Sequence, residues 1–305
     1  MAVNVGMLPK GNSMHQAETL QSIMAGRKAR HSLAPAAGPM VRVISITSGK
    51  GGVGKTNVTA NLAAALQRLG KKVLILDADL NLANIDVLLG LTPRYNLQHV
   101  FSGERSLAEV LITAASGFSI LPGSSGILEL ADLDESQKLF FLEEMEGLGR
   151  DLDFLLVDTA AGINGNVVYF NLAAQERIVL LTPEPTSMTD AYALIKVLSS
   201  RYDVKRFRIL VNLARSDREG KTVFRKLSEV ADRFLDTISL DYLGHLPLDD
   251  HLPRSVRKQQ LVVEGFPSAP FSAALAGVAE QLAGERPETS AAGSIQFFWR
   301  GMMTL

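Results

Sequence analysis

The sequence predicts an α/β fold in which a doubly wound, mostly parallel β-sheet carries helices on both faces. Three observations support this prediction. Short apolar runs alternate with helix-length segments between residues 41 and 283, as in α/β domains with a parallel sheet. Each run is mostly hydrophobic on both faces, which is typical of strands buried between two helix layers. A glycine-rich loop follows the first run directly and leads into a helical pattern.

Composition narrows the class of protein. With 47% hydrophobic residues the chain of 305 residues can bury a sizeable core, and 31 basic against 32 acidic residues give no overall bias toward nucleic acids. The absence of cysteine excludes disulfides, thiolate zinc sites and cysteine-ligated iron–sulfur clusters. We find no signal-peptide pattern and no uncharged stretch long enough to cross a bilayer, so we expect a cytoplasmic protein.

The first expected strand, 41–47, runs into a segment that fits the phosphate-binding motif G-x-x-x-x-G-K-[ST]. Its glycines let backbone N–H groups face phosphate oxygens, and the helical pattern 56–70 adds the positive end of its dipole. We expect Lys55 to reach the β- and γ-phosphates and the Thr56 hydroxyl to bind Mg²⁺. The sequence thus predicts a P-loop NTPase, with a nucleotide-binding loop made of Gly49, Lys50, Gly51, Gly52, Val53, Gly54, Lys55, Thr56 and Asn57.

The later strands are expected to end at the same edge of the sheet, where ligands of such folds bind. The run 153–159 ends in Asp158 and Thr159, and an acidic residue there is what Mg²⁺ coordination requires. The helical pattern 186–200 lies between the apolar runs 177–183 and 207–213. The remaining expected strands are 71–79, 118–123, 177–183, 207–213 and 241–247.

A second lysine in the loop, Lys50, is not needed by an ordinary P-loop. Residues 50–56 read KGGVGKT and resemble the deviant Walker A family, which includes MinD and ParA. The resemblance implies that Lys50 reaches across a two-fold interface to the phosphates held by a partner subunit. There it would act like an arginine finger, and pairing of two subunits would depend on the γ-phosphate. The simpler alternative is a solvated lysine on a loop.

The same resemblance assigns further residues. The segment 74–84 matches the family's first switch, which implies that Asp79 positions the attacking water and Asp77 lies near the Mg²⁺ shell. Both carboxylates could instead cap the next helix. Asp158 falls in the second switch, although Ala160-Ala161 departs from the family pattern. Asn212 and Pro247 lie where the family contacts adenine, and no guanine-type N-K-x-D motif is present, which favours ATP. The implied roles are catalytic for Lys50, Lys55 and Asp79, and metal-binding for Thr56, Asp77 and Asp158.

Residues 1–40 form a polar extension with a short helical pattern near 13–25. This pattern fits a capped helix, but HQAETLQ at 15–21 also resembles the D-Q-A-x-x-L-R element of the FlhG (FleN) family of flagellar-number regulators. The run TPEPTSMTDAY at 182–192 is similar to that family as well. The resemblance implies a helix that stimulates an FlhF-type GTPase, although His15 and Gln21 depart from the element. The matching residues are Gln16, Ala17 and Leu20.

The segment 284–305 combines a linker with an apolar ending. Its hydrophobic residues follow the spacing of one face of an amphipathic helix, and Trp and Phe suit a bilayer interface. We expect reversible binding to an anionic membrane surface, strengthened when two copies act together. The alternative is a helix that packs on its own domain. The residues of this face are Ile295, Phe298, Trp299, Met302 and Met303.

Together these features predict three parts: the extension 1–40, a MinD-like ATPase domain 41–283 and the tail 284–305. The expected protein is an ATP-dependent homodimeric switch, slow to hydrolyse ATP to ADP and phosphate unless stimulated, that regulates flagellum number and placement. Expected partners are an FlhF-type GTPase, flagellar C-ring proteins and, as a further candidate, a FleQ-type transcription activator. Alternatives are a MinD-like division-site regulator and a ParA-type DNA partition ATPase. Acidic residues dilute the basic run 201–226, so direct DNA binding is not expected.

Overall fold

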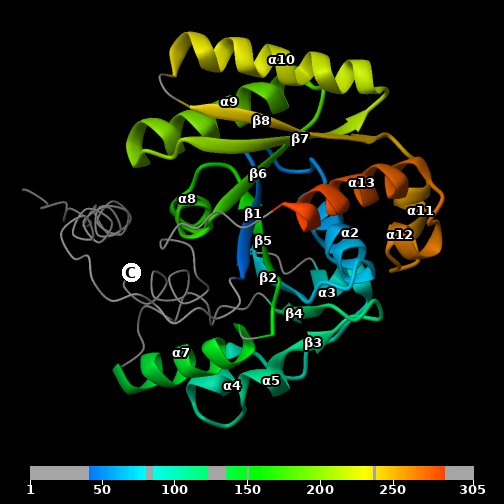
Figure 1. Ribbon diagram of the computed structural model, residues 1–305. Helices are drawn as coiled ribbons and strands as arrows, with labels where there is room; N and C mark the ends of the chain where they lie inside the picture. Colours follow the sequence, from blue (N-terminus) through cyan, green and yellow to red (C-terminus); the bar gives the residue numbers. More distant parts are fainter. Residues whose placement is uncertain (1–40, 80–84, 123–134, 150, 236–237, 286–305) are drawn as a thin grey trace, which may run out of the picture.

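The computed structural model describes residues 41–79, 85–122, 135–149, 151–235 and 238–285. Within these residues eight strands form one sheet in the order β3-β4-β2-β5-β1-β6-β7-β8 (Figure 1). Neighbouring strands run parallel, except that β3 and β4 are antiparallel. The predicted fold class, a doubly wound and mostly parallel sheet, is therefore confirmed.

The strands lie close to the seven apolar runs, and one short strand was not expected. The exception is β3, whose two residues are too few to give a periodic pattern. The bounds are β1 Arg42–Ser48, β2 Val73–Ala78, β3 Ile112–Thr113, β4 Ser119–Leu121, β5 Phe154–Ala161, β6 Glu176–Leu181, β7 Arg206–Ala214 and β8 Ser239–Pro247.

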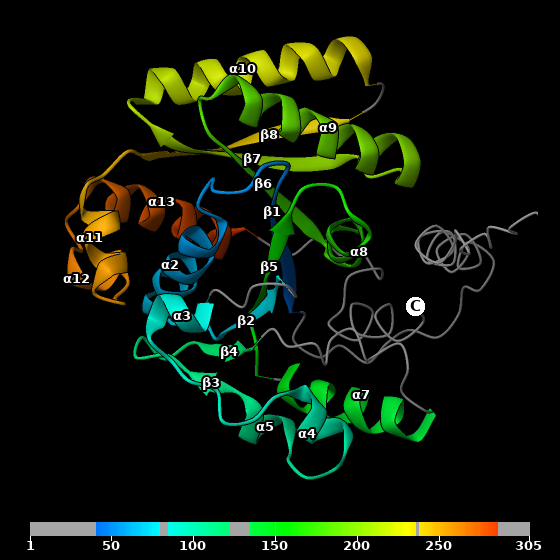
Figure 2. The ribbon, with the colours of Figure 1, turned by 180° about the vertical axis from the view of Figure 1, so that it is seen from behind.

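Helices cover both faces of the sheet (Figures 1 and 2). Along β1, side chains alternate between two buried clusters: Val43 packs into one, and Ile44 and Ile46 pack into the other. This alternation explains why the strand is apolar on both faces. The helices are α2 Lys55–Arg68, α3 Ile85–Leu89, α4 Leu97–Phe101, α5 Leu107–Val110, α7 Glu135–Gly149, α8 Gly165–Ala173, α9 Pro185–Tyr202, α10 Asp217–Phe234, α11 His251–Arg257, α12 Val262–Gly265 and α13 Pro270–Gly284.

The strand order places a topological switch beside β1. The chain passes from β1 through α2 to β2 on one side, whereas β5 leads through α8 to β6 on the other. Connections that diverge in this way leave a crevice beyond the carboxyl ends of the strands, where ligands of open α/β sheets bind. The glycine-rich loop follows β1 and therefore lies at this crevice.

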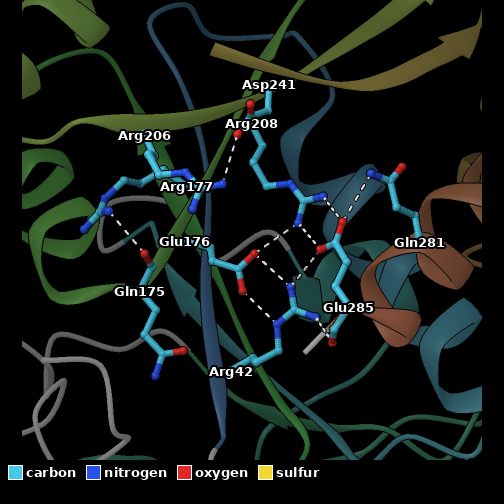
Figure 3. Close-up of a pocket in the computed structure, with 9 residues that line it drawn as sticks. All are labelled: Arg42, Gln175, Glu176, Arg177, Arg206, Arg208, Asp241, Gln281 and Glu285. Atoms are coloured by element: carbon cyan, nitrogen blue, oxygen red, sulfur yellow. Dashed lines mark hydrogen bonds and ion pairs between the residues drawn. The ribbon is translucent and has the colours of Figure 1, made fainter. Parts of the chain in front are cut away.

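The opposite edge of the sheet is closed by an ion-pair cluster of four residues, Arg42, Glu176, Arg208 and Glu285 (Figure 3). Arg42 donates to both carboxylate oxygens of Glu176 at 2.7 and 2.8 Å, and Arg208 donates to both oxygens of Glu285 at 2.6 Å. Bidentate pairs of this kind combine geometric specificity with charge. The cluster ties the first strand to the end of α13.

A cavity of about 470 Å³ lies beside this cluster. The arginine side chains that line the cavity already donate hydrogen bonds to protein acceptors. Arg177, for example, donates to the carbonyl oxygens of Asn171, Ala174 and Gln175. The cavity is also at the wrong edge of the sheet for a nucleotide. We therefore treat the cluster and its cavity as structural.

Candidate functional site

The loop after β1 has the backbone geometry of a phosphate cradle. Gly52 and Gly54 adopt φ angles of 78° and 94°, which favour glycine, and α2 begins directly after Gly54 without a side-chain cap. A methyl group on Gly54 would lie 2.7 Å from the amide nitrogen of Asn212. The amides at the start of α2 are therefore left for an anionic ligand.

The loop lysine, Lys55, is buried at the centre of this arrangement. Its ammonium donates to the hydroxyl of Ser48 at 3.0 Å. Burial lowers the pKa of Lys55, and the negative charges of Asp158 and Asp79 oppose that shift. The lysine thus lies within the field of both predicted carboxylates, in the position from which the motif expects it to meet phosphate.

Two neighbouring strands bring the buried carboxylates together. Asp77 of β2 is in register with Asp158 of β5, and each side chain is about 1% exposed. Burial raises the pKa of Asp158 to about 7, hydrogen bonds from Thr56 and Thr59 oppose the rise, and the charge of Asp77 adds to it. Such crowding of negative charge fits a site that a cation occupies.

One carboxylate oxygen of Asp158 lacks a hydrogen-bond partner among the described residues. The Thr59 hydroxyl donates to Oδ1 at 3.3 Å, but Oδ2 is buried and has no hydrogen-bond partner among the described residues. A buried carboxylate oxygen without a partner fits the oxygen chemistry of Mg²⁺. Thr59 was missed by the sequence analysis; it lies one helical turn after Lys55, so helix geometry is the signal that identifies it.

Asp77 and Asp79 differ in their surroundings. Asp77 accepts the backbone N–H of Asp79 at 3.2 Å and that of Ile85 at 3.3 Å, so it organises the chain after β2. Asp79 follows the end of β2 and is only partly buried. The structure places both aspartates at the carboxyl edge of the sheet, where the sequence predicted them.

The predicted base-binding residues lie beside the loop. The Asn212 amide donates to the carbonyl of Val53 at 2.8 Å, while its Oδ1 is buried without a partner among the described residues. Pro247 ends β8 and pairs with Ala214 of β7. An amide held by the P-loop, with an acceptor oxygen left over, fits recognition of a base amino group.

Lys50 makes two contacts that the sequence analysis did not foresee. Its ammonium lies 2.6 Å from Oε2 of Glu184 and 2.9 Å from the hydroxyl of Thr186. Both partners belong to the run 182–192, whose sequence indicates a family resemblance but no contact. They lie 134 and 136 residues away in sequence, so no local pattern identifies them.

The remaining predicted residues fall outside the described part of the chain. The partner-activating residues Gln16, Ala17 and Leu20 belong to 1–40, and the proposed membrane face belongs to 286–305. Among the described residues, no helix is long and apolar enough to cross a membrane.

The basic run 201–226 lies along β7 and α10. Several of its cations pair with nearby acids, for example Lys205 with Asp203 and Lys221 with Asp217, each at 2.7 Å. This pairing reduces the positive field that a phosphate backbone would meet.

Comparisons with known proteins agree with this site. A family model described as "ParA: NUBPL iron-transfer P-loop NTPase" matches residues 40–283. The chain is 46% identical over 258 residues to "Antiactivator FleN" of Pseudomonas aeruginosa, covering 85% of this chain and 92% of that protein. It is 35% identical over 243 residues to "Flagellum site-determining protein YlxH" of Helicobacter pylori, covering 80% and 81%.

Solved structures show the same architecture. The MinD cell division protein of Aquifex aeolicus superposes with a TM-score of 0.62 at 30% identity, covering 82% of this chain and 100% of that one. MinD of Pyrococcus horikoshii, solved with Mg-ADP, gives a TM-score of 0.61 at 28% identity, covering 80% and 98%. The iron-transfer part of the family description lacks its usual ligands here, because the chain has no cysteine.

Proposed function

Since the chain belongs to the ParA/MinD family of P-loop NTPases and is homologous to the flagellar regulators FleN and YlxH, we propose that it is an ATP-dependent dimerising switch that regulates the number and placement of flagella. The observation that carries the proposal is the 46% identity to FleN over most of both chains, combined with an intact loop that contains the additional Lys50. A loop of this kind needs a second subunit to use both of its lysines.

The residues of one subunit would bind the nucleotide as follows. The amides of 49–54 and of the α2 N-terminus hold the phosphates, and Lys55 pairs with the β- and γ-phosphates. Thr56, Asp77 and Asp158 are the residues that would hold Mg²⁺. The ion would supply positive charge that neutralises the phosphate groups. Asp79 orients a water molecule toward the γ-phosphate.

Hydrolysis to ADP and phosphate would depend on the partner subunit. Lys50 of one subunit would enter the site of the other and stabilise the charge that develops on the transferred phosphoryl group. Asn212 and the loop after Pro247 would bind adenine. A lone subunit lacks the second cation, so slow turnover is expected until the dimer forms and a partner protein stimulates it.

The two terminal segments would connect this cycle to its partners. The residues of the proposed membrane face would bind an anionic inner membrane surface reversibly and more strongly in the dimer. The element around Gln16 would stimulate an FlhF-type GTPase. Flagellar C-ring proteins are further proposed partners, and the name of FleN as an antiactivator supports a FleQ-type transcription activator as another.

Sedimentation with anionic liposomes tests this proposal. The samples are the full chain, Lys50→Ala, a chain that ends at Glu285 and so keeps the ion pair with Arg208, and the matched control Lys221→Ala, each with Mg-ATP or Mg-ADP at fixed salt. Lys221 pairs with Asp217 on the exposed side of α10, so its loss controls for removal of one positive charge.

We expect the full chain and Lys221→Ala to pellet with ATP but not with ADP, and the other two variants to stay in the supernatant. If every sample stays in the supernatant with either nucleotide, membrane binding by the tail is wrong. If Lys50→Ala pellets like the full chain, the proposed role of Lys50 in dimerisation is wrong.

A further inference from the structure

The turn between β6 and α9 is built to hold the side chain of Lys50. The Thr182 N–H donates to the buried Ser187 hydroxyl at 3.0 Å, and Pro185 opens α9. Glu184 occupies the N-cap position of α9 but makes no capping hydrogen bond. Its carboxylate is therefore available to Lys50, at 2.6 Å, with the Thr186 hydroxyl as a second acceptor.

The backbone of the P-loop lies against the same helix. A methyl group on Gly49 would lie 2.0 Å from the carbonyl oxygen of Asp190, a distance that no real Cβ tolerates. The loop therefore passes directly over the first turns of α9, and only glycine permits this approach. Lys50 follows Gly49, so its side chain starts from a fixed point next to Glu184 and Thr186.

The pair between Lys50 and Glu184 is on the surface. The side chains are 37% and 62% exposed, and exposed ion pairs contribute little free energy. Such a pair can order the Lys50 side chain, but a group with more negative charge can displace the Glu184 carboxylate from the ammonium. The phosphates of a bound nucleotide carry more negative charge than one carboxylate, so they compete with Glu184 for the ammonium group.

We propose that Glu184 and Thr186 are positioning residues for Lys50. They hold its ammonium within the lone subunit and release it to the nucleotide of the partner subunit, so that Glu184 sets the protein concentration at which ATP drives dimerisation. This inference rests on the proposed function, in which Lys50 acts in trans. It adds a competing site in cis, which the sequence resemblance does not supply.

The size of the effect follows from the contact. Loss of an exposed ion pair changes an equilibrium by a factor of about 1.4 to 5. Each dimer needs two lysines to be released, so the Glu184→Gln variant should have a dimer dissociation constant about two- to twenty-five-fold lower than the wild type. A carboxylate that instead supported Lys50 inside the dimer would give a change of the opposite sign.

Sedimentation velocity of the full chain over a range of protein concentrations measures this constant. The ligands are Mg²⁺ with a non-hydrolysable ATP analogue, or with ADP. The variants are Glu184→Gln, Lys50→Ala and the double variant. Glu229→Gln is the matched control, because Glu229 is also an exposed glutamate that pairs with a cation, Arg225 of α10, at 3.8 Å.

We expect Glu184→Gln to dimerise more tightly with the ATP analogue only, and Glu229→Gln to match the wild type. In the Lys50→Ala background dimerisation should be weak, and Glu184→Gln should not strengthen it, because the competing contact no longer exists. ATP turnover per subunit should rise at low protein concentration for Glu184→Gln and equal the wild type at saturating concentration. A residue with only a structural role would not change this concentration dependence.

The possible failures can be told apart. If Lys50→Ala fails to dimerise while Glu184→Gln dimerises no better than the wild type, the positioning role is wrong and the proposed function stands. The positioning role is also wrong, and the proposed function stands, if Glu184→Gln lowers the dimer dissociation constant of Lys50→Ala by the same factor as that of the wild type. If the wild type does not dimerise with the ATP analogue, or Lys50→Ala dimerises equally well, the proposed function and this inference are both wrong.

Discussion

Replacing Asp158 by asparagine should stabilise the nucleotide-free protein at high pH. The carboxylate is fully buried, and burial is the main cause that raises its pKa from 3.8 to about 7. A carboxyl group whose pKa is higher in the folded state than in the unfolded state favours folding below its unfolded pKa. That contribution is lost as the pH rises through the folded value, here between about pH 4 and about pH 7.

The magnitude follows from this window. The folded-state pKa of about 7 lies two units above pH 5. Ionisation of Asp158 between about pH 5 and about pH 8 should therefore lower the unfolding free energy of the wild type by up to about 2.7 kcal/mol. Asparagine does not titrate, so the variant lacks this loss. The difference in unfolding free energy between variant and wild type should therefore grow by about 1 to 3 kcal/mol between these two pH values.

Urea denaturation with a chelator and no nucleotide measures this difference at both pH values. Comparing the change with pH, rather than one absolute value, cancels any hydrogen bonds that the amide makes differently. With excess Mg-ADP the wild type should become more stable than the variant. Ligand at a hundred times its dissociation constant adds about 2.7 kcal/mol to the unfolding free energy of the wild type, and the variant gains less. An unchanged difference between the two pH values would refute the reasoning that Asp158 is destabilised by burial.

Three further predictions concern single contacts. Gly49→Ala should lower the thermal midpoint and weaken nucleotide binding, at a cost of about 1–3 kcal/mol from overpacking, whereas Gly51→Ala, whose added methyl meets nothing closer than 4.0 Å, should leave the thermal midpoint of the nucleotide-free protein near the wild-type value. Arg42→Met should destabilise the fold by about 1–3 kcal/mol in urea denaturation, because Glu176 loses both hydrogen bonds from Arg42 but keeps Arg208 at 3.1 Å; the exposed Arg206→Met should cost less than about 1 kcal/mol. Asn212→Ala should weaken ATP binding about ten-fold in calorimetric titration, through loss of its hydrogen bonds, and equal affinity would contradict its role at the base.

The sequence predicted most of the features that depend on a local pattern. The phosphate-binding motif occupies eight consecutive residues, 49–56, and the aspartates at the ends of β2 and β5 follow apolar runs directly. Their place at one edge of the sheet therefore follows from parallel pairing alone. The strand β3 was not predicted, because its two residues are too few to show a periodic pattern. The shared register of Asp77 and Asp158 also needed the structure, because the strand order β2-β5-β1 is not encoded in any one segment.

Contacts between distant segments were decided only by tertiary structure. Lys50 and Glu184 lie on different crossover units, and their pairing depends on how α9 packs over the P-loop at Gly49. Arg42 and Glu285 come together because the first strand and the last described helix meet at the amino edge of the sheet. A sequence motif specifies which chemical groups are available, but the distance between groups more than a hundred residues apart is set by the packing of the whole core.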